Sequence, residues 1–337
     1  MHPLIQLAAD RIQLFLSPSG QPHAILPTCD ATPIYSEQFF TYLVTLADTQ
    51  QTDFPTSAKL AYDLRRLNSQ AEASRRTQPV PLRTFKPDPE TLLIDLQENL
   101  EAIELTRKGW KITANFDAPF LRPTLNYSLP IPEPPKHDLP TYLAQLFEIN
   151  QEPAQQLAMW LAQALLPDGQ PPILVITGKA RDAAATKLRT IIDPVPQALF
   201  PLPSTTNQLG QLALTNRVLA FAAYGPLTQK KKVAFNTLCK GMPIRLKEVN
   251  KRGPQIFTTV SRPIIITSET PQEIGDHQIT IEINKANPGD HPQILGALLD
   301  FASAALAKSP VSQTETIVET KLPIFPPINT ESGTRGP

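Results

Sequence analysis

Residues 173–188 read ILVITGKARDAAATKL, and this stretch decides how the C-terminal half of the chain is interpreted. An apolar run ends at Gly178, and an alanine-rich segment with helical propensity follows it. A buried strand, a glycine turn and a helix form the outline of a phosphate-binding loop, in which backbone N–H groups at the helix start hold phosphate. The stretch therefore predicts either a nucleotide site or a strand and helix that hold no nucleotide.

The chemical groups of a working phosphate loop are missing from this stretch. The pattern G-x-x-x-x-G-K-[ST] needs a second glycine, a lysine for the phosphates and a hydroxyl for magnesium. Counted from Gly178, these three places hold Ala183, Ala184 and Ala185. Lys179, Thr186 and Lys187 are nearby, but any alignment that recovers the lysine loses the glycine. The spacing favours a strand and an alanine-rich helix over a working ATP site.

Composition excludes several other classes of protein. The 337 residues include 31 basic and 31 acidic side chains, so any surface for nucleic acid must be a local patch. The two cysteines, Cys29 and Cys239, lack the spacing of a zinc site or a disulfide framework, which indicates a reducing cytoplasm and no metal. No run approaches the roughly 18 apolar residues of a membrane span. We therefore expect a cytoplasmic protein with no membrane partner.

Proline-rich sequence marks the expected domain boundary. Residues 126–140, NYSLPIPEPPKHDLP, predict an extended linker. Residues 1–125 predict a small α+β module, with a hairpin around Gly20, a helix capped by Ser36 and short strands between residues 91 and 114. Residues 141–308 predict helices and then continuous apolar strands alternating with helices, which is typical of a parallel sheet. Residues 309–337 lack periodicity and predict a disordered tail.

A basic hairpin is expected between the later strands of that sheet. PIRLKEV (243–249) and PQIFTTV (254–260) alternate on either side of a turn at residues 250–253. The cations on this hairpin and just before it are Arg245, Lys247, Lys251, Arg252, Lys230, Lys231 and Lys232. Such a patch would contact phosphates without reading base sequence. The alternative is a solvated hairpin and an exposed helix start whose lysines only maintain solubility.

The order of these elements resembles that of a known family. With GWKITANFDAPFLRPTLNYSLPIPEP (109–134), RVLAFAAYG (217–225), RPIIITSE (262–269) and ILGALLDFASAAL (294–306), the chain resembles primase-helicase-like ATP-binding proteins of bacterial mobile elements and phages. These proteins are related to superfamily 3 helicases of the AAA+ class. The resemblance spans residues 10 to 308 and implies an α/β fold, with a P-loop NTPase (AAA+-like) parallel sheet domain after a small α+β domain. It also implies that the basic hairpin faces DNA.

The chain departs from this family where the family carries its catalytic groups. The loop lysine and serine correspond to Ala184 and Ala185. The strand VLAFAAY (218–224) should end in magnesium-binding carboxylates, but Ala222 and Ala223 occupy those places. Thr267 stands where the family's polar sensor, usually asparagine, follows the next strand. The sequence predicts a degenerate member of the family.

A fourth departure concerns the arginine that one subunit supplies to its neighbour's phosphate. It would lie near Asp276 and His277, where the sequence has no arginine. Phosphoryl transfer depends on positioning and charge neutralisation, so losing the lysine, the magnesium ligands and the arginine together leaves little to stabilise the transition state. We therefore expect a protein that is not an enzyme and needs no cofactor.

The expected function is that of a non-catalytic pseudo-ATPase in a phage or mobile-element replication or maintenance system. Its expected partners are DNA, through the basic hairpin, and a replication protein or active helicase. One alternative is a divergent ATP-dependent helicase subunit that uses ATP and magnesium, with Lys179 or Lys187 in place of the missing lysine. The other alternative is a protein-binding scaffold that takes neither nucleotide nor DNA.

Overall fold

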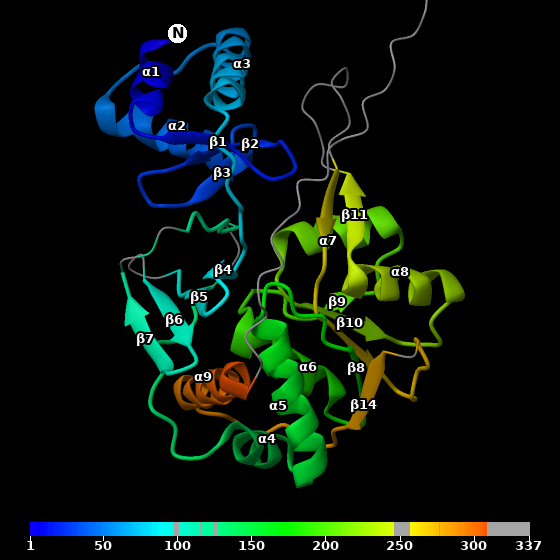
Figure 1. The fold of residues 1–337 in the computed structure, drawn as a ribbon. Coiled ribbons are helices and arrows are strands. Elements are labelled where there is room, and N and C mark those ends of the chain that lie inside the picture. The colour runs from blue at the N-terminus through cyan, green and yellow to red at the C-terminus, as the bar shows by residue number, and fades with distance from the viewer. Residues whose placement is uncertain are drawn as a thin grey trace, which may run out of the picture.

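The computed structural model describes residues 1–97, 101–114, 116, 118–123, 127–245, 257–275 and 277–308. Lys247, Lys251 and Arg252 of the expected basic hairpin, Asp276 and the expected tail (309–337) lie outside the described residues. Figure 1 shows three sheet-containing parts: a small sheet with helices at the N-terminal end, a second sheet beside helix α9, and an α/β part that holds the glycine turn.

The N-terminal part is a three-stranded antiparallel sheet with helices. It contains α1 (Pro3–Ala9), β1 (Gln13–Leu16), β2 (Pro22–Ile25), β3 (Ala31–Pro33), α2 (Glu37–Gln50) and α3 (Ser57–Ser74). The expected hairpin is confirmed, since β1 pairs antiparallel with β2 and Gly20 in its turn has φ +82°. Ser36 caps α2 as predicted, because its Oγ accepts a hydrogen bond of 3.1 Å from the Phe39 N–H.

A four-stranded antiparallel sheet follows, and it shares its core with helices from later in the chain. Its strands are β4 (Thr84–Asp88), β5 (Thr91–Asp95), β6 (Ala102–Thr106) and β7 (Gly109–Thr113), in that order. Leu92 opposite Leu105 and Ile94 opposite Ile103 present one apolar face. This face packs with α4 (Leu139–Phe147), α5 (Gln151–Leu165) and α9 (His291–Lys308) in one cluster. The core therefore continues across the predicted linker, and the domain boundaries stay a prediction.

The C-terminal part contains the predicted parallel sheet. Its five strands are β8 (Ile173–Thr177), β9 (Phe200–Pro201), β10 (Leu219–Ala223), β13 (Ile264–Ser268) and β14 (Gln278–Glu282). They lie in the order β14-β8-β13-β10-β9, and all are parallel. Counted along the chain within this sheet, the order is 5-1-4-3-2. The strand before the glycine turn therefore lies inside the sheet, between the fourth and fifth strands.

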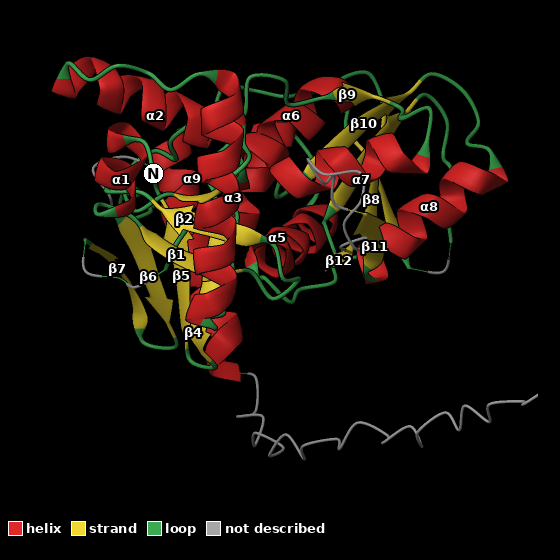
Figure 2. Ribbon diagram, turned by 90° about the horizontal axis from the view of Figure 1, so that it is seen from above, coloured by secondary structure: helices red, strands yellow, loops and turns green. Residues whose placement is uncertain are grey.

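Both faces of this sheet are covered, which explains its continuous apolar strands. Along β8, Leu174 and Ile176 face the core formed with α5, α9 and α6 (Arg181–Ile192). Ile173 and Val175 face the opposite core, formed with α7 (Thr206–Thr215) and α8 (Gln229–Lys240). Figure 2 shows the four-stranded and five-stranded sheets on opposite sides of the molecule, with α5 and α9 between them.

A two-stranded hairpin extends from the α7 and α8 side. β11 (Met242–Arg245) pairs antiparallel with β12 (Phe257–Val260), with Met242 opposite Val260 and Arg245 opposite Phe257. This pairing confirms that the two alternating runs of the sequence form a hairpin at its base. The expected tip, residues 246–256, lies outside the described residues.

Candidate functional site

The turn between β8 and α6 stands where a phosphate loop would be, and its glycine serves a close approach within the protein. Gly178 has φ +96°, and a Cβ placed on it would lie 2.4 Å from the carbonyl oxygen of Ile283. Ile283 follows β14, the strand beside β8, and its N–H donates to the carbonyl of Thr177 over 2.8 Å. Gly178 is therefore needed for the packing of two neighbouring chain segments, whatever the turn binds.

Two backbone donors of this turn, those of Lys179 and Ala180, are already occupied. The Lys179 N–H donates to Asn284 Oδ1 over 3.1 Å, and the Ala180 N–H donates to the Ile283 carbonyl over 3.0 Å. Only residues 178–180 separate β8 from α6, so the chain has no long loop that could wrap around a phosphate. A phosphate at this turn would have to displace two internal acceptors that come from the segment after β14.

The first turn of α6 carries charged side chains that lie beside groups of opposite charge. Arg181 Nη1 donates to the Gly178 carbonyl over 3.3 Å, and its Nη2 lies 3.4 Å from Glu269 Oε1. Asp182, in the same first turn, supplies the negative charge that a helix N-terminus favours. Ala184 and Ala185, where the resemblance implies a lysine and a serine, are fully buried in the core. The two alanines therefore pack α6 into the core, and Asp182 supplies the negative charge at the N-terminus of the helix.

The remaining predicted positions of this site differ in exposure. Ala183 and Lys179 are exposed, and Thr186 is half-buried. Lys187 is half-buried near the start of α9, where burial and the positive charge of Lys187 lower the pKa of His291. Neither lysine forms an ion pair with a described carboxylate.

The neighbouring strands bring the other predicted positions to the same edge of the sheet, their carboxyl ends. Ala222 of β10 pairs with Thr267 of β13, and Thr267 pairs in turn with Ile176 of β8. All three are buried. Ala222 and Ala223, the last two residues of β10, carry methyl groups where the resemblance implies magnesium-binding carboxylates. These two positions therefore do not fit a metal ion bound with a nucleotide.

The protein covers this edge with its own polar groups. Gln272 Nε2 donates to Ser268 Oγ over 3.0 Å, and Gln272 Oε1 accepts from the Leu227 N–H over 3.2 Å. Gln272 and Ser268 are both buried. Sequence reasoning missed Gln272 and Asn284, because neither belongs to a motif and each acts on a segment distant in sequence. Only the strand order brings them to the site.

The described part of the predicted basic patch lies on α8 and β11. Thr228 caps α8, and Lys230, Lys231 and Lys232 occupy its first turn, where cations oppose the helix dipole. Lys230 lines a groove with Met242 and Pro243 of β11. Arg245 is exposed at the end of that strand. The groove therefore connects Lys230 with the base of the hairpin, although α8 leads into β11 at its C-terminal end and the three lysines lie at its other end (Figure 1).

Two further properties concern the described part of the chain. No cluster of three or more His, Cys, Asp or Glu side chains among the described residues is arranged to hold a metal ion. None of the described helices is both long and apolar enough to cross a membrane.

Comparisons with known proteins found only distant likenesses. No protein-family model matches the sequence, and no curated protein matches it. The apo A form of the NrS-1 C-terminal region is 12% identical, with a TM-score of 0.46, over 92% of this chain and 70% of its own. A full-length MCM homolog from Methanopyrus kandleri is 12% identical, with a TM-score of 0.34, over 81% of this chain and 77% of its own. JCV helicase, in a crystal structure with a bound thiazolopyridinyl-phenoxyphenyl acetamide, is 12% identical, with a TM-score of 0.24, over 50% of this chain and 57% of its own. Because each TM-score lies under 0.5, the proposals below depend on the chain's own residues.

Proposed function

We propose that this protein is a non-catalytic relative of AAA+-like P-loop domains that acts as a DNA-associated or helicase-partner component of a phage or mobile-element replication or maintenance system. The observation that carries the proposal is the occupied turn between β8 and α6. Asn284 accepts the hydrogen bond of its Lys179 N–H group, and Ile283 accepts that of its Ala180 N–H group. The five-stranded parallel sheet supports the proposal as well, because the resemblance implies a parallel sheet domain that carries this turn.

The absence of ATP hydrolysis follows from the chemistry of phosphoryl transfer. Catalysis needs cations and a magnesium ion around the transferred group. The buried methyl groups of Ala184, Ala222 and Ala223 stand where the resemblance implies a lysine and magnesium-binding carboxylates. Asn284 holds the Lys179 N–H, and the Lys187 side chain is near the start of α9. The positions where the resemblance implies a phosphate-binding lysine and magnesium ligands therefore offer neither of these groups.

Association with DNA would come from the cations of α8 and β11. Three lysines at the N-terminus of a helix oppose the helix dipole, so helix stability does not account for them. Arg245 adds a further exposed cation on strand β11 of the hairpin. Lys247, Lys251 and Arg252, on the adjoining segment, belong to the same proposal. Contacts of this kind go to the DNA backbone and weaken steeply as the salt concentration rises.

The test combines nucleotide and DNA binding on the full chain. Isothermal titration with ATP and magnesium should show no saturable binding, and a phosphate-release assay should show no hydrolysis. Fluorescence anisotropy at about 50 mM and about 200 mM salt should show salt-sensitive binding of single-stranded or duplex DNA. A variant with Lys230, Lys231, Lys232 and Arg245 changed to alanine should lose most of that binding.

The matched control removes the same charge elsewhere. Arg65, Arg66, Lys108 and Lys136 are exposed and lie outside α8 and the hairpin, so changing them to alanine should leave DNA binding within about twofold. Magnesium-dependent hydrolysis that Lys179→Ala or Lys187→Ala abolishes would contradict the proposal and establish a divergent helicase subunit. Absence of DNA binding at low salt, with a protein partner retained at high salt, would establish a scaffold instead.

A further inference from the structure

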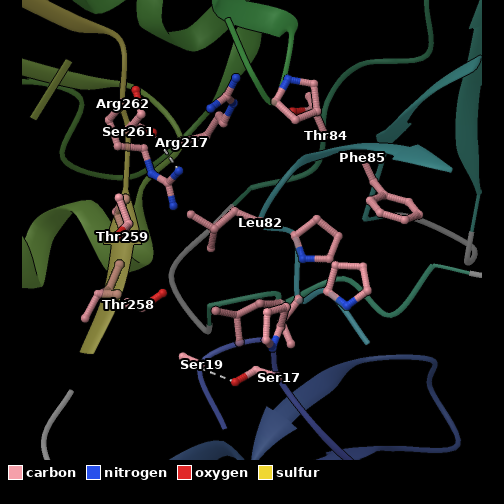
Figure 3. A pocket seen from close by; sticks show the side chains of 18 of the residues that line it. Ser17, Ser19, Leu82, Thr84, Phe85, Arg217, Thr258, Thr259, Ser261 and Arg262 are labelled. Carbon is pink, nitrogen blue, oxygen red and sulfur yellow. Dashed lines mark hydrogen bonds between the residues drawn. The ribbon is translucent and has the colours of Figure 1, made fainter. Parts of the chain in front are cut away.

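A cavity of about 570 Å³ lies at the opposite edge of the five-stranded sheet, where the strands begin. Its walls come from the β1–β2 turn, the segment 79–85, strand β12 and the residues that precede β10 and β13. Figure 3 shows Arg217, Ser261 and Arg262 together at one end of this cavity, Ser17 and Ser19 at the other, and Phe85 across from Thr258 and Thr259. Three parts of the protein meet around it, which is a common location for a ligand site.

The sheet places two arginines together at this edge. Arg217 stands two residues before β10, and Arg262 stands two residues before β13. The two strands are parallel neighbours with Leu219 opposite Ile264, so the residues before them are also level with each other. The Leu219 N–H donates to the Pro263 carbonyl over 3.0 Å, which extends the pairing toward the arginines. The pattern Arg-x-apolar before each strand is therefore a sequence signal for this site.

Arg262 is fixed in place and still has a free donor. Its Nε donates to the Ala213 carbonyl over 2.8 Å, and its Nη1 donates to the Ser261 carbonyl over 2.9 Å. Its Nη2 donates to no residue in the described part of the chain, and no described carboxylate forms an ion pair with it. Two neutral acceptors hold the guanidinium without neutralising its charge.

Arg217 adds a second positive charge deeper in the wall. It is only 3% exposed, and its Nη2 donates to the carbonyls of Ala164 and Leu166. Its Nε is buried and has no hydrogen-bond partner among the described residues. This guanidinium is also held by neutral carbonyls, so its charge adds to that of Arg262.

The carboxylates nearest to these arginines are engaged elsewhere. Asp193 Oδ2 accepts from the backbone N–H groups of Arg217 and Val218 over 2.8 and 3.1 Å, and its Oδ1 lies 3.6 Å from Arg83 Nη2. Asp168 forms an ion pair with Lys86 over 2.9 Å. None of the described residues that line the cavity is acidic, whereas Lys240 adds a third cation to the lining.

The lowered pKa values of Arg217 and Arg262 agree with positive charge that is only partly neutralised at this end of the cavity. Burial, and then repulsion from Arg217, lower the pKa of Arg262 to about 9, although Asp193 opposes the shift. Burial lowers the pKa of Arg217 to about 10, although the charges of Asp193 and Asp168 oppose the shift. Both groups are still charged at neutral pH, and an anion beside them would relieve the cost of keeping the charges close together.

We propose that this cavity binds a phosphate group carried by a ligand of nucleotide size. Arg262 Nη2 would donate to the phosphate in the field of Arg217 and Lys240, because guanidinium donors suit phosphate oxygens. The volume falls within the range of small-molecule sites. Phe85 on the opposite wall offers an aromatic face for a base. The ligand is a free nucleotide or the terminal nucleotide of a nucleic-acid strand. This inference does not depend on the proposed function, since the cavity and the β8–α6 turn lie at opposite edges of the sheet.

The experiment titrates the full chain with four probes: pyrophosphate, AMP, and a short oligothymidylate with and without a terminal phosphate. Isothermal titration should show saturable binding of AMP, or of the phosphorylated strand in preference to the unphosphorylated one. Arg262→Gln should weaken that binding by about tenfold or more, because a charge-assisted hydrogen bond is lost. Arg181→Gln is the matched control, since it removes an arginine from the other edge of the sheet and should change affinity by less than about twofold.

A second variant covers the possibility that Arg262→Gln impairs folding. Thr259 is exposed on the cavity wall, so Thr259→Glu adds a negative charge without removing a core contact, and it should weaken binding by about tenfold as well. Preference for AMP would identify a free nucleotide as the ligand, and preference for the phosphorylated strand would identify a strand end. Absence of saturable binding for every probe, or equal loss in Arg181→Gln, would overturn the proposal.

Discussion

The two edges of the five-stranded sheet differ in what their polar groups have left to bind. At the carboxyl edge, Asn284 and Ile283 use the backbone donors of the glycine turn, and Gln272 covers the strand ends. At the amino edge, Arg217 and Arg262 are held by neutral carbonyls and keep donors that no described residue uses. The edge with the familiar motif outline is closed, and the edge without a motif is open. Unsatisfied hydrogen-bonding capacity is therefore a better guide to a site here than the outline of a motif.

Among the changes that test this comparison, Asp193→Asn should cause the largest loss in the free energy of unfolding. Asp193 is fully buried, faces Arg83 and accepts from two backbone N–H groups behind the amino edge. The amide would leave Arg83 without its ion-pair partner, so we expect a loss of about 3 kcal/mol in the free energy of unfolding, measured by urea denaturation. Asp168→Asn, at an exposed ion pair, should cost less than about 0.5 kcal/mol. Equal losses would show that the arginines do not depend on Asp193.

The second-largest loss in the free energy of unfolding should come from Gly178→Ala, at the carboxyl edge. The added Cβ would lie 2.4 Å from the Ile283 carbonyl oxygen, at a φ of +96° that alanine rarely adopts. We expect a loss of about 2 kcal/mol in the free energy of unfolding. Gly225→Ala is the control, because no atom lies within 4 Å of its added Cβ, and it should be nearly neutral. A neutral Gly178→Ala would show that the turn is looser than its contacts indicate.

A smaller effect is a pH dependence at the cavity, through His23. Burial lowers the pKa of His23, and the neutral ring pairs with the Gln21 carbonyl over 2.8 Å and stacks on Phe15. The unfolded chain therefore binds a proton at a higher pH than the folded chain does. Stability from this group is complete above the unfolded value of about 6.5 and decreases as the pH falls below it.

The measurement compares unfolding of the wild type and His23→Gln at about pH 7.5 and about pH 5.5. The wild type should lose more stability than the variant between these two values. His291 has a lowered pKa as well and is present in both proteins, so its contribution cancels in the comparison. Identical pH dependence in the two proteins would show that His23 takes up its proton equally well in the folded chain.

The central elements of the fold are predictable from sequence, and the edge elements are less so. β8, β10 and β13 are buried on both faces and therefore appear as continuous apolar runs. β9 has only two residues and includes Pro201, and β14 alternates as a half-buried edge strand does. Within α7, Gly210 packs against Ile244 of the hairpin, and this glycine weakens the helical signal. Edge elements depend on neighbours that a local pattern does not show.

The same distinction applies to the two sites. The alanines at the phosphate-loop positions can be found by counting along the chain, because a motif is local. Asn284 cannot be found in that way, since it reaches Lys179 only because β14 lies beside β8. Arg217 and Arg262 are an intermediate case. Each precedes an apolar strand that the sequence does predict, but their proximity depends on β10 and β13 being neighbours in register.

The smallest expected effect would test directly whether the carboxyl edge is closed by one side chain. Asn284→Ala removes the acceptor of the Lys179 N–H, and Asn284 is exposed, so the loss in the free energy of unfolding should be about 1 kcal/mol or less. The freed donor should not create an ATP site, because the Ala180 N–H stays bonded to Ile283 and the alanines of α6 and β10 are unchanged. Titration of the variant with ATP and magnesium should therefore match the wild type, and Asn284→Asp, which keeps an acceptor, is the control. Saturable ATP binding by Asn284→Ala alone would mean that the hydrogen bond from the Lys179 N–H to Asn284 is what prevents nucleotide binding at the carboxyl edge. The carboxyl edge would then be a masked nucleotide site.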